Sequence, residues 1–276
     1  LATTLLIETV VAAALALRFF AGYGYGPGQA VWHGVFHAVS AFNNAGFALY
    51  TLSIMDFAAD PWVNLPIVVA VVLGGLGFPV LYQLRREWRR PRRWSMNTRV
   101  VLFGTAVLLP LGTVFLCAVE WSNPATLGPM RAGEKVLAGF FQSVIARTAG
   151  FNSIDIAALH PVSWLGLDLL MLIGGGPAGT AGGLKITTFV VLGFIAYTEI
   201  TGGAAVNVLG RRLSRSVQRQ AITVVVLALG ADAADRESER VLINQYGVGS
   251  SGSWCRWPWP ERSSPTSSGR RPTSRR

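Results

Sequence analysis

The chain has 276 residues, of which 51% are hydrophobic and 14% charged, with a mean hydropathy of +0.42 and a formal net charge of +10. This composition is too apolar for an ordinary soluble domain and predicts an all-α polytopic membrane protein. The positive charge lies in short loops beside apolar segments rather than on a continuous surface, which argues against nucleic acid as a partner.

Long apolar segments recur along the chain. Spanning the hydrocarbon core of a bilayer takes about 20 helical residues. Four segments meet this length, and the fourth is nearly twice as long and interrupted by glycines: residues 1–20, 62–84, 100–121 and 163–201. The lipid bilayer is therefore the first partner that the sequence predicts.

A short amphipathic stretch that runs into an Ala-Gly-Phe turn occurs twice between these segments. The stretches, residues 30–42 and 133–146, are too short to cross a membrane and too apolar for surface loops, so re-entrant half-helices are predicted. We call the turns the first Gly loop (Asn44, Ala45, Gly46 and Phe47) and the second Gly loop (Thr148, Ala149, Gly150 and Phe151). The chain is predicted to hold two span–pore-loop–span repeats, residues 1–84 and 100–201.

Both Gly loops have the composition that an ion filter needs. A selective cation pore replaces the water that an ion loses with fixed oxygens, usually backbone carbonyls. Glycine lets the backbone turn those carbonyls inward because it adopts positive φ without steric cost. The preceding half-helices direct partly negative C-terminal ends toward the same place, which favours cations. A single such turn would predict only a tight connection between helices, whereas two between spans predict an ion filter.

The fourth apolar segment contains six glycines and a proline within ten residues. Helix is disfavoured there by about 1 kcal/mol for each glycine and about 3 kcal/mol for the proline, so a broken helix is predicted. The alternative is a close-packed seam of small residues, which is the role expected for residues 74–77. The predicted gate loop, which we call the Gly-rich segment, comprises Gly174, Gly175, Gly176, Pro177, Ala178, Gly179, Thr180, Ala181, Gly182 and Gly183.

Lys185 directly follows the Gly-rich segment and is assigned to the predicted gate. It is either a functional charge within the membrane or a side chain that reaches the cytoplasmic interface.

Arginines predict the orientation of the chain. Residues 85–99 hold seven arginines against one acid, and four more follow the fourth apolar segment: Arg211, Arg212, Arg215 and Arg219. By contrast, residues 21–61 contain two aspartates and no Lys or Arg. Short basic loops mark the cytoplasmic side of the plasma membrane. The basic loops are thus expected to be cytoplasmic and both Gly loops external.

The C-terminal part differs in character from the rest of the chain. Residues 202–231 are expected to form a basic loop and an incomplete further span. Residues 232–276 are rich in Arg, Ser and Pro, cannot bury a core and are expected to be disordered. The abrupt change suggests a truncated or frame-shifted gene.

Polar residues beside the Gly loops have predicted supporting roles. His37 is expected to pack or hydrogen-bond behind the first Gly loop rather than bind a metal. Asn43 and Asn152 are expected to brace the loops through their side-chain amides. Arg147 would repel cations if it faced the pore, so it is expected to point away and pair with Asp155.

Three stretches resemble the Trk/Ktr/HKT family of potassium transporters, and most of all its KtrB-type membrane subunit. They are Phe-His-Ala-Val-Ser-Ala-Phe-Asn-Asn-Ala-Gly-Phe at 36–47, Ala-Arg-Thr-Ala-Gly-Phe-Asn-Ser-Ile-Asp at 146–155, and Ile-Gly-Gly-Gly-Pro-Ala-Gly-Thr-Ala-Gly-Gly-Leu-Lys at 173–185. The resemblance implies four span–pore–span repeats around one pore. Residues 1–231 then correspond to the second and third repeats and the start of the fourth.

The resemblance also implies a function and partners. The chain is expected to belong to a K⁺ uptake subunit that forms a homodimer and is regulated by a cytoplasmic nucleotide-binding subunit. K⁺ is the transported ion, and no bound cofactor or other metal is expected. No nucleophile–base pair, phosphate-binding loop or cluster of metal ligands is visible in the sequence, so enzyme activity is not predicted.

Two other interpretations remain open. Two repeats out of four would leave loop backbone facing lipid, so the chain could be an inert or structural membrane fragment. Whether the gene continues in another reading frame past Ala231 distinguishes this case. A secondary transporter with broken helices is the third interpretation, but it predicts inverted repeats, whereas both copies here have the same sense.

Overall fold

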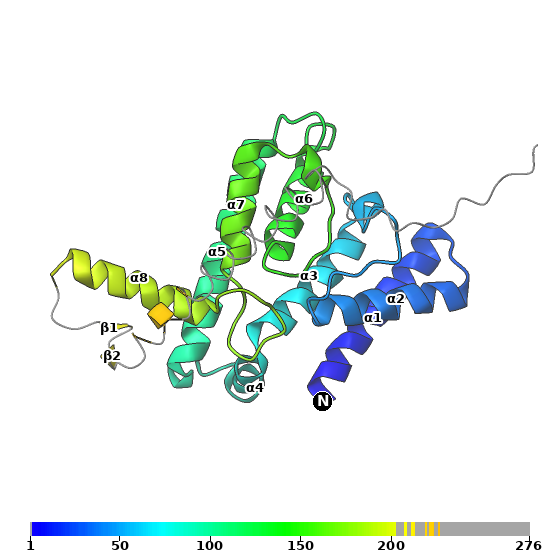
Figure 1. Cartoon of the computed structure of the whole chain (residues 1–276). Helices are drawn as coiled ribbons and strands as arrows, with labels where there is room; N and C mark the ends of the chain where they lie inside the picture. The colour runs from blue at the N-terminus through cyan, green and yellow to red at the C-terminus, as the bar shows by residue number, and fades with distance from the viewer. Residues whose placement is uncertain are drawn as a thin grey trace, which may run out of the picture. The chain divides into compact units, whose positions relative to one another are not determined.

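The computed structural model describes residues 2–202, together with residues 207–208, 211–212, 219, 221–223 and 226. The tail expected at 232–276 lies outside these residues, as does much of the loop and further span expected at 202–231. The main elements (Figure 1) are α1 (Ala2–Tyr23), α2 (Pro27–Phe42), α3 (Pro61–Leu76), α4 (Phe78–Glu87), α5 (Met96–Glu120), α6 (Ala132–Ile145), α7 (Pro161–Leu172) and α8 (Ile186–Ile200). The structure also contains three short 3-10 turns, η1 (Met55–Phe57), η2 (Pro91–Arg93) and η3 (Ile156–Ala158). Two short strands pair with each other: β1 (Asn207–Val208) and β2 (Arg211–Arg212).

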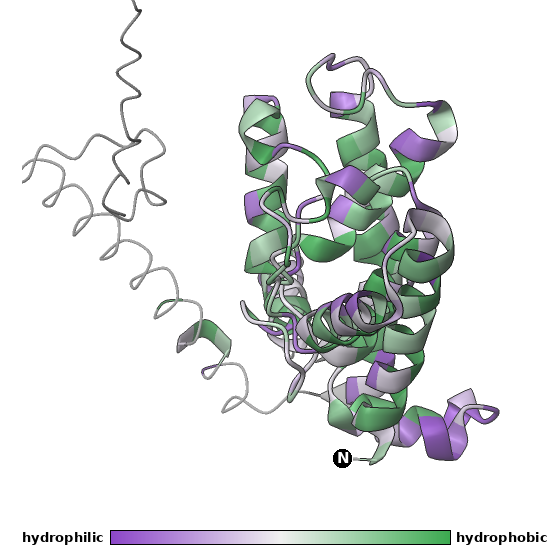
Figure 2. Ribbon diagram, turned by 90° about the vertical axis from the view of Figure 1, so that its right-hand side faces the viewer, coloured by the Kyte–Doolittle hydropathy of each residue, from purple (hydrophilic) through white to green (hydrophobic). Residues whose placement is uncertain are grey.

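The helices have the lengths and compositions of a multi-pass membrane protein. Helices α1 and α5, with 22 and 25 residues, are long and apolar enough to cross a membrane, and the bent pair of α3 and α4 counts as a third candidate. Helices α7 and α8 are shorter, with 12 and 15 residues. Figure 2 shows apolar residues along the helices and a hydrophilic stretch at the end of the molecule that carries the N-terminus. The predicted all-α polytopic fold is confirmed.

The second apolar segment differs from the single span expected at 62–84. Helices α3 and α4 meet at an angle of 101°. Gly77 lies between them with φ 91° and ψ 145°, a conformation that a residue with a Cβ rarely adopts. Pro79 follows two residues later and cannot donate the helical hydrogen bond to the carbonyl four residues before it. These two residues end one helix and begin another in a new direction.

The break between α3 and α4 exchanges hydrogen bonds with the Gly-rich segment. Pro79 has no N–H to donate to the Gly75 carbonyl, and this carbonyl accepts instead from Gly176 N at 2.7 Å. Likewise, Thr180 N donates to the Gly74 carbonyl at 3.1 Å, and Phe78 N donates to the Ala178 carbonyl at 3.3 Å. Unpaired backbone groups are costly away from water. These bonds pair the backbone groups that each broken helix leaves free with groups of the other.

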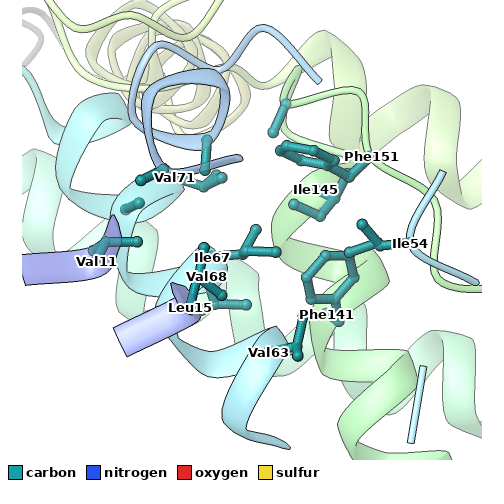
Figure 3. Packing of buried hydrophobic residues seen from close by; sticks show 14 of the residues in the cluster. Val11, Leu15, Ile54, Val63, Ile67, Val68, Val71, Phe141, Ile145 and Phe151 are labelled. Atoms are coloured by element: carbon teal, nitrogen blue, oxygen red, sulfur yellow. The ribbon is translucent and has the colours of Figure 1, made fainter. Parts of the chain in front are cut away.

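The two predicted half-helices are α2 and α6, and both are packed into the core. Figure 3 shows Phe141 and Ile145 of α6 directed toward Ile67 of α3, with Phe151 from the second Gly loop beside them. Helix α2 lies close against α1, because a Cβ added to Gly34 would be only 2.6 Å from the Ala12 carbonyl oxygen. The half-helices therefore reach the centre of the bundle and end there.

Candidate pore loops and the segment beneath them

The two Gly loops have the same backbone pattern. In the first loop, Asn44 and Gly46 have φ of 50° and 72°, and in the second, Thr148 and Gly150 have φ of 68° and 81°. Positive φ is uncommon for residues other than glycine, so its recurrence at two matching positions is specific. The first loop begins two residues after the end of α2, and the second begins three residues after the end of α6. The repeat seen in the sequence is thus a repeat of conformation.

The structure brings the two loops into direct contact at their glycines. A Cβ added to Gly46 would lie 2.5 Å from both the Ala149 carbonyl oxygen and the Gly150 Cα. Such an approach leaves no space for a side chain. Further along, Asn152 N donates to Ser53 Oγ at 3.0 Å, and Ile54 N donates to the Asn152 carbonyl at 3.2 Å. The two loops therefore touch at Gly46 and Gly150, and the segments that follow them are joined by the hydrogen bonds of Asn152.

His37 braces the first Gly loop from behind, as the sequence predicts. Its Nδ1 lies 2.7 Å from the His33 carbonyl, and its Nε2 lies 3.4 Å from the amide of Leu49. Because a carbonyl only accepts, Nδ1 carries the proton and Nε2 accepts from Leu49. Ser40 Oγ also donates to the Phe47 carbonyl at 2.8 Å. The ring therefore acts as a hydrogen-bonded support.

The hydroxyl of Tyr50 extends this network to His33. It lies 2.9 Å from Nδ1 of His33. Burial raises the pKa of the Tyr50 hydroxyl well above its usual range, so the group keeps its proton and can donate.

The two asparagines differ in how they support the loops. Asn43 Nδ2 donates to Glu8 Oε1 at 3.3 Å and to the Val39 carbonyl at 3.0 Å, so its amide links the loop to α1. Asn152 joins the loops through its backbone, and its side chain forms no hydrogen bond with the residues that the structure describes. The side-chain brace expected at Asn152 is not found among those residues.

Arg147 points away from the contact between the Gly loops, but its partner is not the one expected. Its guanidinium is buried and donates to the Gly174 carbonyl at 2.8 Å and to Thr105 Oγ1 at 3.4 Å. Asp155 instead accepts from the Ala157 amide at the start of η3. Sequence reasoning favoured the nearest carboxylate, whereas the guanidinium bonds a backbone carbonyl that the broken helix leaves free.

The Gly-rich segment forms a closed loop between α7 and α8. Its ends are held together because Gly174 N donates to the Leu184 carbonyl at 2.9 Å, and Leu184 N donates to the Leu172 carbonyl at 3.0 Å. Lys185 Nζ donates to the Ala181 carbonyl at 2.7 Å, so this charge bonds within the loop. The helix is broken where the glycines and proline are found.

The same segment touches both Gly loops. Thr180 Oγ1 donates to the carbonyl of Phe42, the last residue of α2, at 3.0 Å and lies 3.3 Å from the side-chain amide of Asn44 in the first Gly loop. In the second Gly loop, Thr148 Oγ1 accepts from Gly182 N at 2.7 Å. A cavity of about 20 Å³, the space of about one water molecule, lies between these parts. Its lining includes Asn44, Thr105 and Arg147. The Gly-rich segment thus lies directly against the ends of the two half-helices.

Glu120 is a buried polar residue to which the sequence analysis gave no role. Its carboxylate accepts from Asn123, Thr126, Ser163 and the backbone amide of His160. Through these bonds it ties the end of α5 to the start of α7. The sequence feature that could have indicated this role is an acidic residue at the end of an apolar span, followed by Asn123 and Thr126. Its partner Ser163, however, is 43 residues away.

Paired half-helices that end in contacting Gly loops within an apolar helical bundle define a multi-pass membrane protein of the pore-loop class. The model of the TrkH family, described as "Cation transport protein", matches residues 1–229. The chain belongs to this family, which comprises transporters rather than enzymes, and the resemblance seen in the sequence is confirmed.

Known relatives agree with this assignment. Ktr system potassium uptake protein B of Bacillus subtilis is 37% identical over 223 residues, and that of Vibrio alginolyticus is 36% identical over 225 residues. Each alignment covers 81% of this chain and 49% of the relative. The crystal structure of the potassium transporter TrkH from Vibrio parahaemolyticus shares the fold, with a TM-score of 0.58 and 21% identity over 81% of this chain and 49% of that one. The chain spans about half the length of the relatives it matches.

Proposed function

We propose that the chain supplies two pore loops to a potassium-selective pathway across the plasma membrane, in an uptake subunit of the Ktr/Trk type. The filter residues are the first Gly loop (Asn44, Ala45, Gly46 and Phe47) and the second Gly loop (Thr148, Ala149, Gly150 and Phe151). The observation that carries this proposal is the shared backbone pattern of two loops 104 residues apart that meet at Gly46 and Gly150.

Electrostatics supports a cation as the transported species. Helices α2 and α6 both end at the loops, so the partly negative C-terminal ends of two helices converge there. Backbone carbonyls near the loops can replace the hydration shell of an ion. The guanidinium of Arg147, the residue before the second Gly loop, donates to the Gly174 carbonyl rather than facing the contact between the loops.

The Gly-rich segment is the proposed gate. Its position against Phe42 and Thr148, at the start of both loops, supports control of the path below the filter. Lys185 and Arg147 hold it through carbonyls at its two ends, Ala181 and Gly174. The Gly-rich segment is held against its neighbours by hydrogen bonds, two of them from the charged side chains of Arg147 and Lys185. Breaking these bonds would let the segment move while the membrane-spanning helices stay folded.

The wider arrangement follows from the family resemblance. The repeats at 1–84 and 100–201 act as two of four around a pore, with both Gly loops external and the arginine-rich loop at 85–99 cytoplasmic. A homodimer of four-repeat chains, regulated by a cytoplasmic nucleotide-binding subunit, is the assembly that this arrangement implies. No cofactor is required for the proposed ion movement.

A complementation experiment tests this function. Residues 1–229 replace the matching part of Ktr system potassium uptake protein B from Bacillus subtilis, and the hybrid is expressed in a bacterial strain that lacks K⁺ uptake. Growth at low K⁺ and uptake of ⁸⁶Rb⁺ are the expected results. A correctly inserted hybrid without uptake would instead favour an inert membrane fragment, which the match to only half of each relative keeps as the second candidate.

A further inference from the structure

A cleft lies between the first turn of α1 and helix α4, away from the Gly loops. Its volume is about 490 Å³. Its walls are formed by Thr3 and Thr4 of α1 and by five residues of α4: Phe78, Leu81, Tyr82, Arg85 and Arg86. None of these residues contributes to the proposed filter or gate.

The spacing of the α4 residues gives this cleft an apolar end and a cationic end. Residues three and four positions apart share one face of a helix, so Phe78, Tyr82 and Arg86 lie in a row. The row is apolar in its first turns and positive in its last. Phe78 and Tyr82 are also widely exposed, at 51% and 67%, so their rings are available to a ligand in the cleft.

The bend at Gly77 decides what surrounds α4. Helix α3 is the more apolar helix of the pair, and the angle of 101° means that α4 lies close to the membrane plane when α3 lies along the membrane normal. A helix in that position, with aromatic residues and arginines, has the composition of an interfacial helix. A cleft beside such a helix is expected to open at the level of lipid headgroups.

Among the residues that the structure describes, no carboxylate lines this cleft. Arg85 Nη1 donates to Thr3 Oγ1 at 3.0 Å, which holds one guanidinium across the cleft. Within the part of the chain that the structure describes, the sole ion pair is Arg18 with Asp60, so neither Arg85 nor Arg86 is neutralised there. Arg85 and Arg86 both line the cleft, and guanidinium groups bind phosphate oxygens well.

We propose that this cleft binds an anionic phospholipid, with the phosphate on Arg85 and Arg86 and the start of the acyl chains against Phe78, Leu81 and Tyr82. A free phosphate ion would use only the cationic end. The apolar end, continuous with the membrane, is what favours a lipid over a soluble anion.

Native mass spectrometry of the purified full chain in neutral detergent tests this proposal, with phosphatidylglycerol and phosphatidylcholine added in equal amounts. Retention of phosphatidylglycerol over phosphatidylcholine is expected. Arg85→Gln/Arg86→Gln is expected to lower that preference about tenfold, and Arg89→Gln/Arg90→Gln, which removes the same charge just after α4, is expected to leave it unchanged. Equal loss in both double variants would overturn the site, because it would show a general effect of charge.

Two further arms separate the lipid from other ligands and guard against misfolding. Tyr82→Ala changes a side chain that is exposed and forms no hydrogen bond with the described residues, so it is expected to weaken retention while the size-exclusion profile stays unchanged. Displacement of the lipid by millimolar inorganic phosphate would overturn the proposal in favour of a soluble anion. Equal retention of both lipids would show an apolar groove without headgroup recognition, and this too would overturn it.

Discussion

The guanidinium of Arg147 donates a hydrogen bond of 2.8 Å to the carbonyl of Gly174. This bond joins the residue before the second Gly loop to the first residue of the Gly-rich segment. When the Gly-rich segment moves, either this hydrogen bond breaks or Arg147 moves with the segment. The coupling of filter and gate is the feature from which the first prediction follows.

Arg147→Gln is expected to loosen the Gly-rich segment. Loss of the guanidinium leaves the buried Gly174 carbonyl unpaired, at a cost of about 1–3 kcal/mol. A cysteine at Ala178, in a chain with Cys117→Ala and Cys255→Ser, should then react with a maleimide about tenfold faster in native membranes. Arg131→Gln is the matched control because Arg131 is exposed. Equal labelling rates with and without Arg147 would show that the bond does not hold the segment.

Gly77→Ala is expected to destabilise the fold by about 1–3 kcal/mol, because φ of 91° strains any residue with a Cβ. The new methyl would also overlap the Pro177 carbonyl oxygen and lie 3.2 Å from Gly179 N, and so press on the Gly-rich segment. Thermal unfolding of the purified chain in detergent measures the effect. Gly193→Ala is the control, since its site within α8 has open space around it. If both variants unfold at the same temperature, the bend does not depend on glycine.

Glu120→Gln is expected to lower stability by about 2–3 kcal/mol. The carboxylate accepts four hydrogen bonds, whereas an amide would turn its NH₂ toward groups that are themselves donors. The same thermal unfolding assay measures this loss. Glu134→Gln serves as its control, because Glu134 accepts from the exposed Arg131 backbone and should change stability by less than about 1 kcal/mol. Equal losses would contradict the role assigned to Glu120.

The proposed orientation can be tested with single cysteines in the same cysteine-free background. Thr51 follows the first Gly loop and Arg90 follows α4, and both are exposed. An impermeant thiol reagent added to intact cells should label Thr51→Cys, and should label Arg90→Cys only after the cells are made permeable. The reverse pattern would place the Gly loops in the cytoplasm.

The sequence predicted the features that depend on local pattern. Apolar length indicated the membrane fold, and the repeated Ala-Gly-Phe turn located the ends of α2 and α6 to within a few residues. The bend at Gly77 was missed because the freed carbonyls of Gly74 and Gly75 are satisfied by residues about 100 positions away. The partner of Arg147 was missed for the same reason. Contacts between two broken helices depend on their tertiary approach, which a local pattern does not contain.

The most direct test of the central claim is the ion preference of the Bacillus subtilis hybrid carrying Gly46→Ser or Gly150→Ser. A Cβ at either position disfavours positive φ and meets the opposite loop, so the carbonyls that replace water around the ion should lose their alignment. The measurement is competitive K⁺ and Na⁺ uptake per inserted molecule, with Gly193→Ser as the control. The account predicts that the preference for K⁺ falls at least about tenfold in both loop variants, while the control keeps it. An unchanged K⁺ preference in either correctly inserted loop variant would contradict the assignment of these loops as a filter.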